Sequence, residues 1–326
     1  MRKLTYRHTK YASYLGYITQ AVVNNLAPLL FVTFQKEFNI SLEMVTFLIT
    51  MNFGVQIITD VVFGLLIDKM GYRTAGVLAH VLCFLGLVSM GVLPYTLPVP
   101  YWGLAIATVF NAVGGGIAEV LISPLVESLP GKEKDSAMSM LHSFYCWGQV
   151  SVVLFSTLYF LTIGKEAWRF LPILWSLLPL ANAFFFTRVP MCTLMDQLEE
   201  QISLKKLFSK GGFWILLMLM LCAGASELTM SQWSSLFAET TLGVSKTLGD
   251  LLGPCAFAFL MGIARTAYGL LGAKIKLKPA LALSGLLCVL SYGLTVLPIP
   301  PLLSLLGCAM CGLSVGLMWP GTISLA

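Results

Sequence analysis

The chain has 326 residues, of which 57% are hydrophobic and only 11% are charged. Soluble proteins of this length do not hold so large an apolar share, so the composition predicts an all-α polytopic membrane protein, with the lipid bilayer as its main partner. The net charge of +5 does not predict nucleic-acid binding, because the basic residues are scattered through loops. No phosphate-binding loop and no hydrolytic or redox constellation is present, so we expect neither an ATP-driven pump nor an enzyme, and no cofactor.

Most of the eight cysteines lie inside apolar runs. Cys308 and Cys311 have CxxC spacing, but they fall within a predicted membrane helix and no histidine stands at a metal-ligand spacing from them. We interpret the cysteines as small apolar side chains and expect no metal site.

A membrane-spanning helix needs roughly 20 apolar residues. Runs of this kind cover residues 11–34, 44–66, 74–93, 101–126, 137–162, 168–188, 213–238, 249–271, 279–297 and 302–325. The one long loop, 189–212, has a charge pattern that allows short amphipathic helices on the cytoplasmic surface. We therefore expect an N-terminal six-helix bundle at 1–188, a cytoplasmic linker at 189–212, and four helices of a C-terminal bundle at 213–326.

Lysine and arginine are unevenly divided between the two sets of alternate loops. The set that includes the N-terminus holds most of them, whereas the opposite loops hold only Lys36, Lys165, Arg169 and Lys246. Positive charge gathers on the cytoplasmic side of membrane proteins, so we expect a multi-pass plasma-membrane protein with a cytoplasmic N-terminus. The first apolar run lacks a small-residue cleavage site, and we expect no cleavable signal.

The chain also repeats itself. Residues 64–73, between the second and third runs, share their Gly-Leu-Leu opening and later basic residues with residues 269–278. A glycine followed eight positions later by a proline recurs in the fourth and tenth runs, as Gly116 with Pro124 and Gly312 with Pro320. These echoes predict a duplicated bundle of six helices each, so that an eleventh and a twelfth helix are expected beyond the ten seen.

The first copy of this turn resembles the Gly-x-x-x-Asp-Arg-x-Gly-Arg-Arg turn of the major facilitator superfamily. Gly64, Asp68, Gly71 and Arg73 match that pattern, and Lys69 keeps the charge of the usual arginine. The resemblance implies the major facilitator fold, with two six-helix bundles, and a gating role for the four matching residues. We expect close helix approach at Gly64, a tight turn at Gly71, and Asp68 near the positive end of the following helix.

Glu119 is the strongest functional candidate, because an ionisable side chain within a membrane span is costly unless it faces a cavity or a partner. It follows three glycines, 114–116, and precedes Ser123 and Pro124, so this helix can bend beside a cavity. A neutral packing glutamate is the alternative.

The segment is similar to the fourth helix of the fucose–proton symporter branch, where the acid helps to couple protons to sugar. That branch also has an acid in its first helix, but Asn25 stands at the corresponding place here and cannot titrate. The resemblance therefore leaves Glu119 as the proton-coupling candidate, and the two-acid scheme of the branch does not carry over.

Other polar residues in the spans form a candidate substrate site. Gln20 and Asn24 have i, i+4 spacing on the first helix, beside Asn25, and we expect them to face the central cavity. In the seventh helix Trp233 offers a flat surface to a sugar ring, with Gln232 and Glu227 for its hydroxyls; an interfacial tryptophan anchor is the alternative. The remaining members of the predicted site are Gln149 and Trp319, together with Glu119.

Four residues fit less well into this site. We expect Asp60 and Arg265 near helix ends as gating partners, and His80 in packing. For His142, a structural or gating role and a part in transport chemistry both stay open.

These features predict a secondary transporter that moves a small polar solute, with a sugar as the first choice, by alternating access and proton coupling. Drug or metabolite efflux is one alternative, and the methionines at 218, 220, 230 and 261 would suit it. A membrane sensor that has kept the fold without transport is the other alternative.

Overall fold

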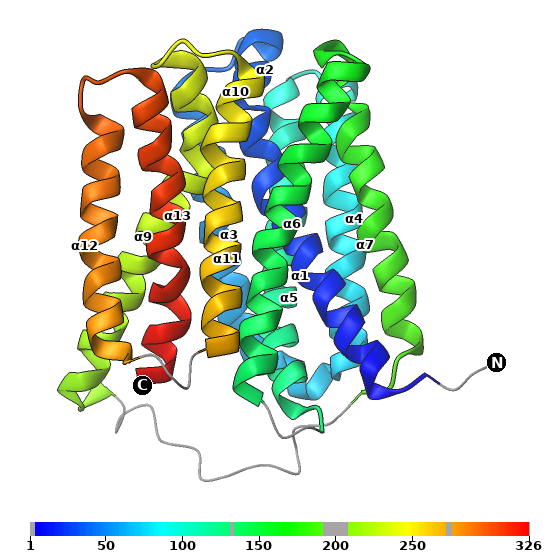
Figure 1. The fold of residues 1–326 in the computed structure, drawn as a ribbon. Coiled ribbons are helices and arrows are strands. Elements are labelled where there is room, and N and C mark those ends of the chain that lie inside the picture. Colours follow the sequence, from blue (N-terminus) through cyan, green and yellow to red (C-terminus); the bar gives the residue numbers. More distant parts are fainter. Residues whose placement is uncertain (1–3, 131–133, 192–207, 272–275, 326) are drawn as a thin grey trace. The chain divides into compact units, whose positions relative to one another are not determined.

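The computed structural model describes residues 4–130, 134–191, 208–271 and 276–325. This part of the chain is almost entirely helical and contains no strand (Figure 1). Its helices are α1 (Tyr6–Leu29), α2 (Phe31–Phe38), α3 (Leu42–Met70), α4 (Tyr72–Thr96), α5 (Pro100–Ser128), α6 (Lys134–Thr162), α7 (Phe170–Arg188), α9 (Gly211–Thr240), α10 (Lys246–Asp250), α11 (Ala256–Leu271), α12 (Leu277–Val296) and α13 (Pro301–Leu325). A 3-10 turn, Lys165–Ala167, precedes α7, and a π-helical turn, Leu251–Cys255, joins α10 to α11.

Within the described residues, nine helices are long and apolar enough to cross a membrane, and α10, its π-helical turn and α11 count as one of them. The pair α1 and α2, bent by 49°, passes the same test together, which gives ten spans when the bent pair is counted as one. Pro28 explains the bend, because a proline inside a helix removes a hydrogen-bond donor and its ring collides with the preceding turn. Each predicted span corresponds to one of these ten, which confirms the all-α polytopic class. The expected surface helices of the long loop lie mostly outside the described residues.

The packing divides the chain into two compact units, which we describe separately. The first unit contains residues 1–134 and 154–193, and the second contains residues 135–153 and 194–326. Helix α6 therefore contributes its first part to the second unit and its last part to the first. The division into six helices at 1–188 and four at 213–326 stays a prediction.

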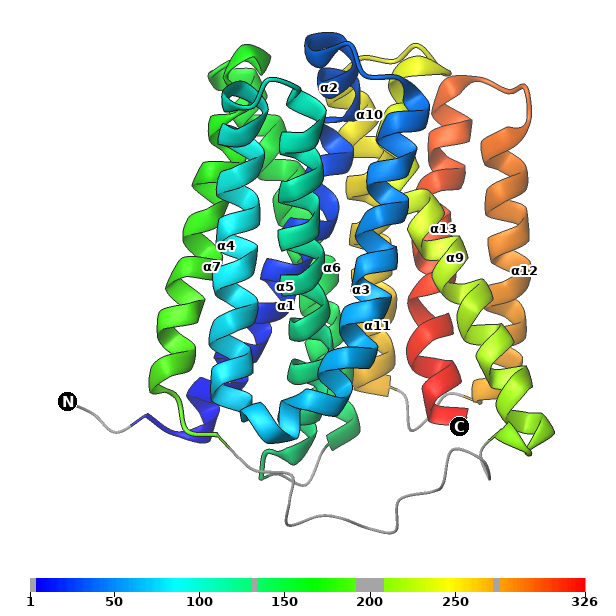
Figure 2. The same ribbon diagram turned by 180° about the vertical axis from the view of Figure 1, so that it is seen from behind.

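Close contact between α4 and α5 organises the first unit, and the two helices lie side by side in both views (Figures 1 and 2). Glycine makes this approach possible. A Cβ atom on Gly86 would lie 2.1 Å from Oδ1 of Asn111, and one on Gly103 would lie 2.5 Å from the backbone nitrogen of Pro94. Helix α5 is thus held between α4 and α3 at a separation that larger residues would prevent.

An aromatic cluster closes one end of the first unit. The ring of Trp168 packs edge-on against Phe34 at a centroid distance of 5.2 Å, and Phe38 and Tyr95 complete the group. Glu37 accepts hydrogen bonds from Tyr95 Oη at 2.5 Å and from the Trp168 indole nitrogen. Each such ring pair contributes about 0.5–1.5 kcal/mol beyond its buried area, so the cluster ties α2, α4 and the start of α7 together.

Glycine also allows close helix packing in the second unit. A Cβ atom on Gly312 would lie 2.0 Å from the carbonyl oxygen of Phe257, so α13 contacts the backbone of α11 directly. At the start of α10, Lys246 Nζ pairs with Asp250 Oδ2 at 3.0 Å in a buried site, and Ser235 donates to the same carboxylate.

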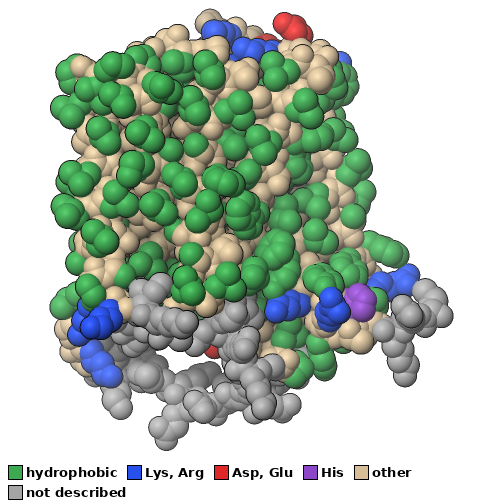
Figure 3. Space-filling model, viewed as in Figure 1, with side chains coloured by type: hydrophobic (Ala, Val, Ile, Leu, Met, Phe, Trp, Pro, Cys, Tyr) green, Lys and Arg blue, Asp and Glu red, His purple; other side chains and the backbone are tan. Residues whose placement is uncertain are grey.

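Hydrophobic side chains cover the lateral surface between the two ends of the helices in the view of Figure 3, and lysine and arginine side chains appear at those ends. This distribution suits a surface in contact with lipid.

Candidate functional site

The turn between α3 and α4 carries the residues predicted to act in gating. Gly71 has a φ of +87°, a conformation that disfavours side chains, and its N–H bonds to the Ile67 carbonyl at 2.8 Å. Asp68 accepts a long bond of 3.4 Å from Tyr72 Oη, which places it beside the first residue of α4. Among the described residues, a Cβ atom on Gly64 would meet nothing within 4 Å. The tight turn is therefore confirmed, whereas no helix of the described part of the chain approaches Gly64 as closely as expected.

Arg73 has a contact that the sequence did not predict. Its guanidinium donates to the carbonyl oxygens of Phe186 at 3.1 Å, Thr187 at 2.5 Å and Val189 at 2.9 Å. These are carbonyls at the C-terminal end of α7, which have no partner within their own helix. Arg73 thus joins the start of α4 to the end of α7.

The structure brings two of the predicted site residues together on different helices. Gln20 of α1 donates from Nε2 to Oε2 of Glu119 on α5, at 2.8 Å. Gln20 is buried, with 5% of its surface exposed, whereas the Glu119 side chain is exposed. A carboxylate held by an amide and open on one side can take a proton or accept a hydroxyl group.

The neighbouring asparagines on α1 have different partners. Asn24 accepts a bond of 2.9 Å from Nε2 of Gln56 on α3, and both side chains are buried. Asn25 donates to the carbonyl of Ala21 in its own helix at 2.9 Å. Gln20 and Asn24 therefore connect α1 to α5 and to α3, respectively, as their shared i, i+4 face allows.

The three glycines before Glu119 each face a particular neighbour. A Cβ atom on Gly114 would lie 2.7 Å from the Ala79 carbonyl of α4. One on Gly115 would lie 3.2 Å from Nε2 of Gln56, and one on Gly116 would lie 3.0 Å from Oδ1 of Asp60. The glycines thus leave room on α5 for α4 on one side and for two polar side chains of α3 on the other.

Asp60 lies well inside α3, because that helix continues to Met70, so the expectation of a helix-end position was wrong. Asp60 is therefore a second carboxyl group within a span of the first unit, besides Glu119. The signal was present in the sequence, since Gln56 and Asp60 have the same i, i+4 spacing as Gln20 and Asn24.

The second unit contains an ion pair between two residues that the sequence analysis considered separately. Arg265 Nη2 lies 2.6 Å from Glu227 Oε2, and the side chains are 4% and 16% exposed. Arg265 Nη1 also lies 3.5 Å from Sγ of Cys146. Arg265 is therefore a buried cation that pairs with Glu227, and its role in gating stays a prediction.

The remaining predicted residues of this unit differ in their burial. The ring of Trp319 lies near Gly224, one turn before Glu227, since a Cβ atom there would be 3.8 Å from Cζ3 of the indole. Gln232 is buried and Trp233 is half-buried. Gln149 is fully buried, and neither of its polar side-chain atoms has a hydrogen-bond partner among the described residues.

His80 fills a packing position, as predicted. Its Nδ1 lies 2.7 Å from the Gly76 carbonyl, its Nε2 lies 2.8 Å from Nδ2 of Asn182, and its ring stacks on Phe186. A neutral ring with the proton on Nδ1 satisfies both bonds at once.

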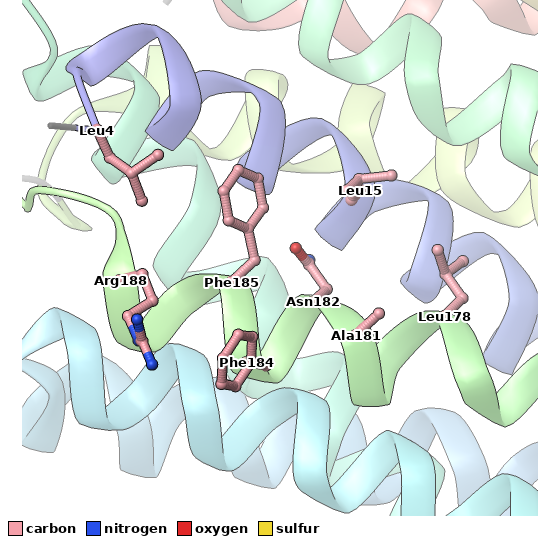
Figure 4. Close-up of a pocket in the computed structure, with 8 residues that line it drawn as sticks. All are labelled: Leu4, Leu15, Leu178, Ala181, Asn182, Phe184, Phe185 and Arg188. Atoms are coloured by element: carbon pink, nitrogen blue, oxygen red, sulfur yellow. The ribbon is translucent and has the colours of Figure 1, made fainter. Parts of the chain in front are cut away.

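A cavity of about 470 Å³ lies between the N-terminal part of α1 and the C-terminal part of α7 (Figure 4). Its lining is almost wholly apolar, and Asn182 and Arg188 are the polar residues that line it. None of the predicted site residues lines this cavity, so it is separate from the Gln20–Glu119 pair.

Membrane-spanning helices with a hydrogen-bonded carboxylate inside a span are features of a membrane transporter. A family comparison agrees: residues 13–326 match the Major Facilitator Superfamily, and the chain belongs to that family.

Solved structures show the same fold. The proton:xylose symporter XylE bound to 6-bromo-6-deoxy-D-glucose superposes with a TM-score of 0.78 at 15% identity, over 97% of this chain and 80% of that one. XylE from E. coli in a partially occluded inward-open conformation gives 0.76 at 13% identity, over 97% and 83%. The E. coli fucose:proton symporter FucP gives 0.69 at 16% identity, over 97% and 83%. Among curated proteins, no sequence matches the chain significantly.

Proposed function

We propose that this protein is a secondary active transporter that moves a small polar solute, with a sugar as the first choice, by alternating access coupled to protons. The observation that carries the proposal is the bond from Gln20 to Glu119, which holds a carboxylate within a membrane-spanning helix. Glu119 is the proton-coupling residue in this proposal, and no enzymatic step is involved. The names of the structural neighbours, which are sugar:proton symporters, support the choice of solute and ion.

The solute site in this proposal uses the polar residues of both units. In the first unit these are Gln20, Asn24, Asn25 and Glu119, and in the second they are Gln149, Glu227, Gln232, Trp233 and Trp319. Gln149 supports this assignment, because a buried amide without a partner among the described residues is a polar group that a bound hydroxyl would satisfy. The residues Gly64, Asp68, Gly71 and Arg73 act in gating, and the basic loops place the N-terminus in the cytoplasm of a plasma-membrane protein.

Replacing Glu119 with Gln tests the proton-coupling role. Glutamine copies the shape of the protonated acid and cannot release a proton. In reconstituted vesicles, the Glu119→Gln variant should lose accumulation driven by a pH gradient while it still exchanges labelled for unlabelled solute, since exchange needs no net proton movement.

Glu127→Gln is the matched control, because Glu127 is an exposed carboxylate near the end of the same helix. This control should accumulate solute as the parent does. If Glu119→Gln also accumulates normally, the proton-coupling role is wrong. Uptake assays with a panel of sugars test sugar symport, and assays with apolar cations test efflux. Ligand binding without any flux would indicate a sensor.

A further inference from the structure

Two hydrogen bonds and two one-turn helix spacings connect Glu119 to Asp60 across three helices of the first unit, and we call this series of residues the circuit. Glu119 bonds to Gln20 on α1, and Asn24 lies one turn further along the same face of that helix. Asn24 bonds to Gln56 on α3, and Asp60 lies one turn beyond Gln56. Asp60 in turn faces Gly116 on α5, one turn before Glu119. The circuit therefore begins and ends at a carboxyl group, with three amides between the two acids.

Asp60 differs from Glu119 in its hydrogen bonding. Its Oδ1 atom is buried, and no described residue donates a hydrogen bond to it. Of the nearby polar groups, Gln56 Nε2 donates to Asn24 at 2.9 Å, and Thr59 Oγ1 donates its one hydrogen to the Val55 carbonyl at 2.8 Å. A buried carboxylate oxygen without a donor is costly, so this oxygen lacks a hydrogen that the protein itself does not provide.

Gln20 also has a buried polar atom that receives no hydrogen bond from the described residues. Its Nε2 donates to Glu119, but its Oε1 is buried without a donor among the described residues. An amide can present either its nitrogen to an ionised carboxylate or its oxygen to a protonated one. Gln20 is thus suited to both protonation states of its neighbour, and the circuit can accommodate the arrival or loss of a proton.

The backbone of α5 provides the space for Asp60. A Cβ atom on Gly116 would lie 3.0 Å from Oδ1 of Asp60 and 3.0 Å from the Cβ of Thr59. Any residue with a side chain would crowd the carboxyl group at this point. Glycine here leaves room for the acid inside the helix bundle, where apolar residues would otherwise be expected.

We propose that Asp60 is a second proton-binding carboxyl group of the transporter, linked to Glu119 through the amides of Gln20, Asn24 and Gln56. This inference deepens the proposed function and rests on it for its role in transport. The step is an exchange with water: the Asp60 carboxylate takes one proton to form an O–H bond and later returns that proton to water. No other bond forms or breaks.

The titratable residue of α5 nearest in sequence to the contact with Asp60 is Glu119, which lies one turn after Gly116. On α4, His80 and Cys83 lie at the opposite side of α5, where His80 is bonded to Gly76 and Asn182, and Cys83 lies against Gly114. The remaining acids of α3, Glu43 and Asp68, lie near its two ends.

Infrared difference spectroscopy of the full chain in lipid, titrated with acid and alkali in the absence of solute, tests the proposal. The carbonyl stretch of a protonated carboxylic acid appears only when a carboxyl group takes a proton. We expect Glu119→Gln to keep one such titrating band from a group shielded from water, and the double variant with Asp60→Asn to lose it. Glu43→Gln, an exposed acid of the same helix, is the control and should leave that band unchanged.

Identical spectra for Glu119→Gln and the double variant would overturn the proposal. If the double variant does not fold, Gly116→Ala takes its place. The added methyl group crowds Oδ1 of Asp60, so the band should shift in this variant. An unshifted band would also overturn the proposal. The measurement needs no solute, so the proposed function can fail in transport assays while the Asp60 band is still observed. Conversely, accumulation that depends on Glu119 together with no Asp60 band leaves the proposed function standing and removes Asp60 from it.

Discussion

Removing the carboxylate of Glu227 should destabilise the second unit, because it removes the negative charge that pairs with the buried guanidinium of Arg265. The two groups lie 2.6 Å apart, and the Arg265 side chain is 4% exposed. At an effective dielectric constant of about 20, the attraction at this distance is about 6 kcal/mol. Desolvation offsets much of it, and deleting one partner of a buried pair costs about 3–5 kcal/mol. We therefore expect Glu227→Gln to lower the free energy of unfolding by an amount in that range.

The assay is thermal unfolding of purified protein in detergent, followed for Glu227→Gln, Arg265→Met and the double variant. The Arg265→Met variant should be destabilised less than the Glu227→Gln variant, because the charge it leaves unpaired, on Glu227, is only partly buried. The double variant should recover most of the loss, because replacing both partners of a buried pair with neutral groups is often close to neutral. Glu166→Gln, at an exposed acid, is the control. If the single variants are as stable as the parent, or if the double variant loses the sum of the two single losses, the two charges do not stabilise each other.

Two further predictions concern the turn between α3 and α4. Gly71→Ala should destabilise the protein by about 1–3 kcal/mol in thermal unfolding, because φ is +87° at this position. Gly64→Ala should be neutral or slightly stabilising, because its described surroundings are open and alanine favours a helix. A loss of stability at Gly64 equal to that at Gly71 would contradict this account. Asp68→Asn should slow the interconversion of inward- and outward-open states, measured by the accessibility of introduced cysteines from each side, and leave solute affinity unchanged. Lost affinity with normal interconversion would remove Asp68 from the gate.

The helices could be predicted from the sequence almost completely. Each apolar run became a span because a bilayer demands about 20 apolar residues and full internal hydrogen bonding, and both requirements can be read from the chain alone. The break in the first span could have been predicted too, since Pro28 lies inside it. The turn at Gly71 was predicted for the right reason, because a helix that ends abruptly needs a residue free to adopt a positive φ.

The partners of the polar residues could not be predicted in the same way. Gln20 and Glu119 were both assigned to a cavity, and Glu227 and Arg265 were both noted, but which side chain meets which depends on helix rotation and depth. Asp60 is the clearest example of a contact that the sequence alone does not predict. It was placed at a helix end because its span was predicted to finish at residue 66, whereas the helix continues to Met70 and the acid faces Gly116.

The bonds of Arg73 to the end of α7 have a consequence for the connection that leaves the first unit. The Arg73 guanidinium holds the carbonyl of Val189, and Thr9 Oγ1 donates to the carbonyl of Pro190 at 2.6 Å. The chain is therefore fixed to α4 and α1 for two residues after α7 has ended. An insertion after Met191 would lengthen the connection without disturbing this anchor. An insertion between Phe186 and Pro190 would move the carbonyls away from their donors and detach the end of α7 from both neighbouring helices.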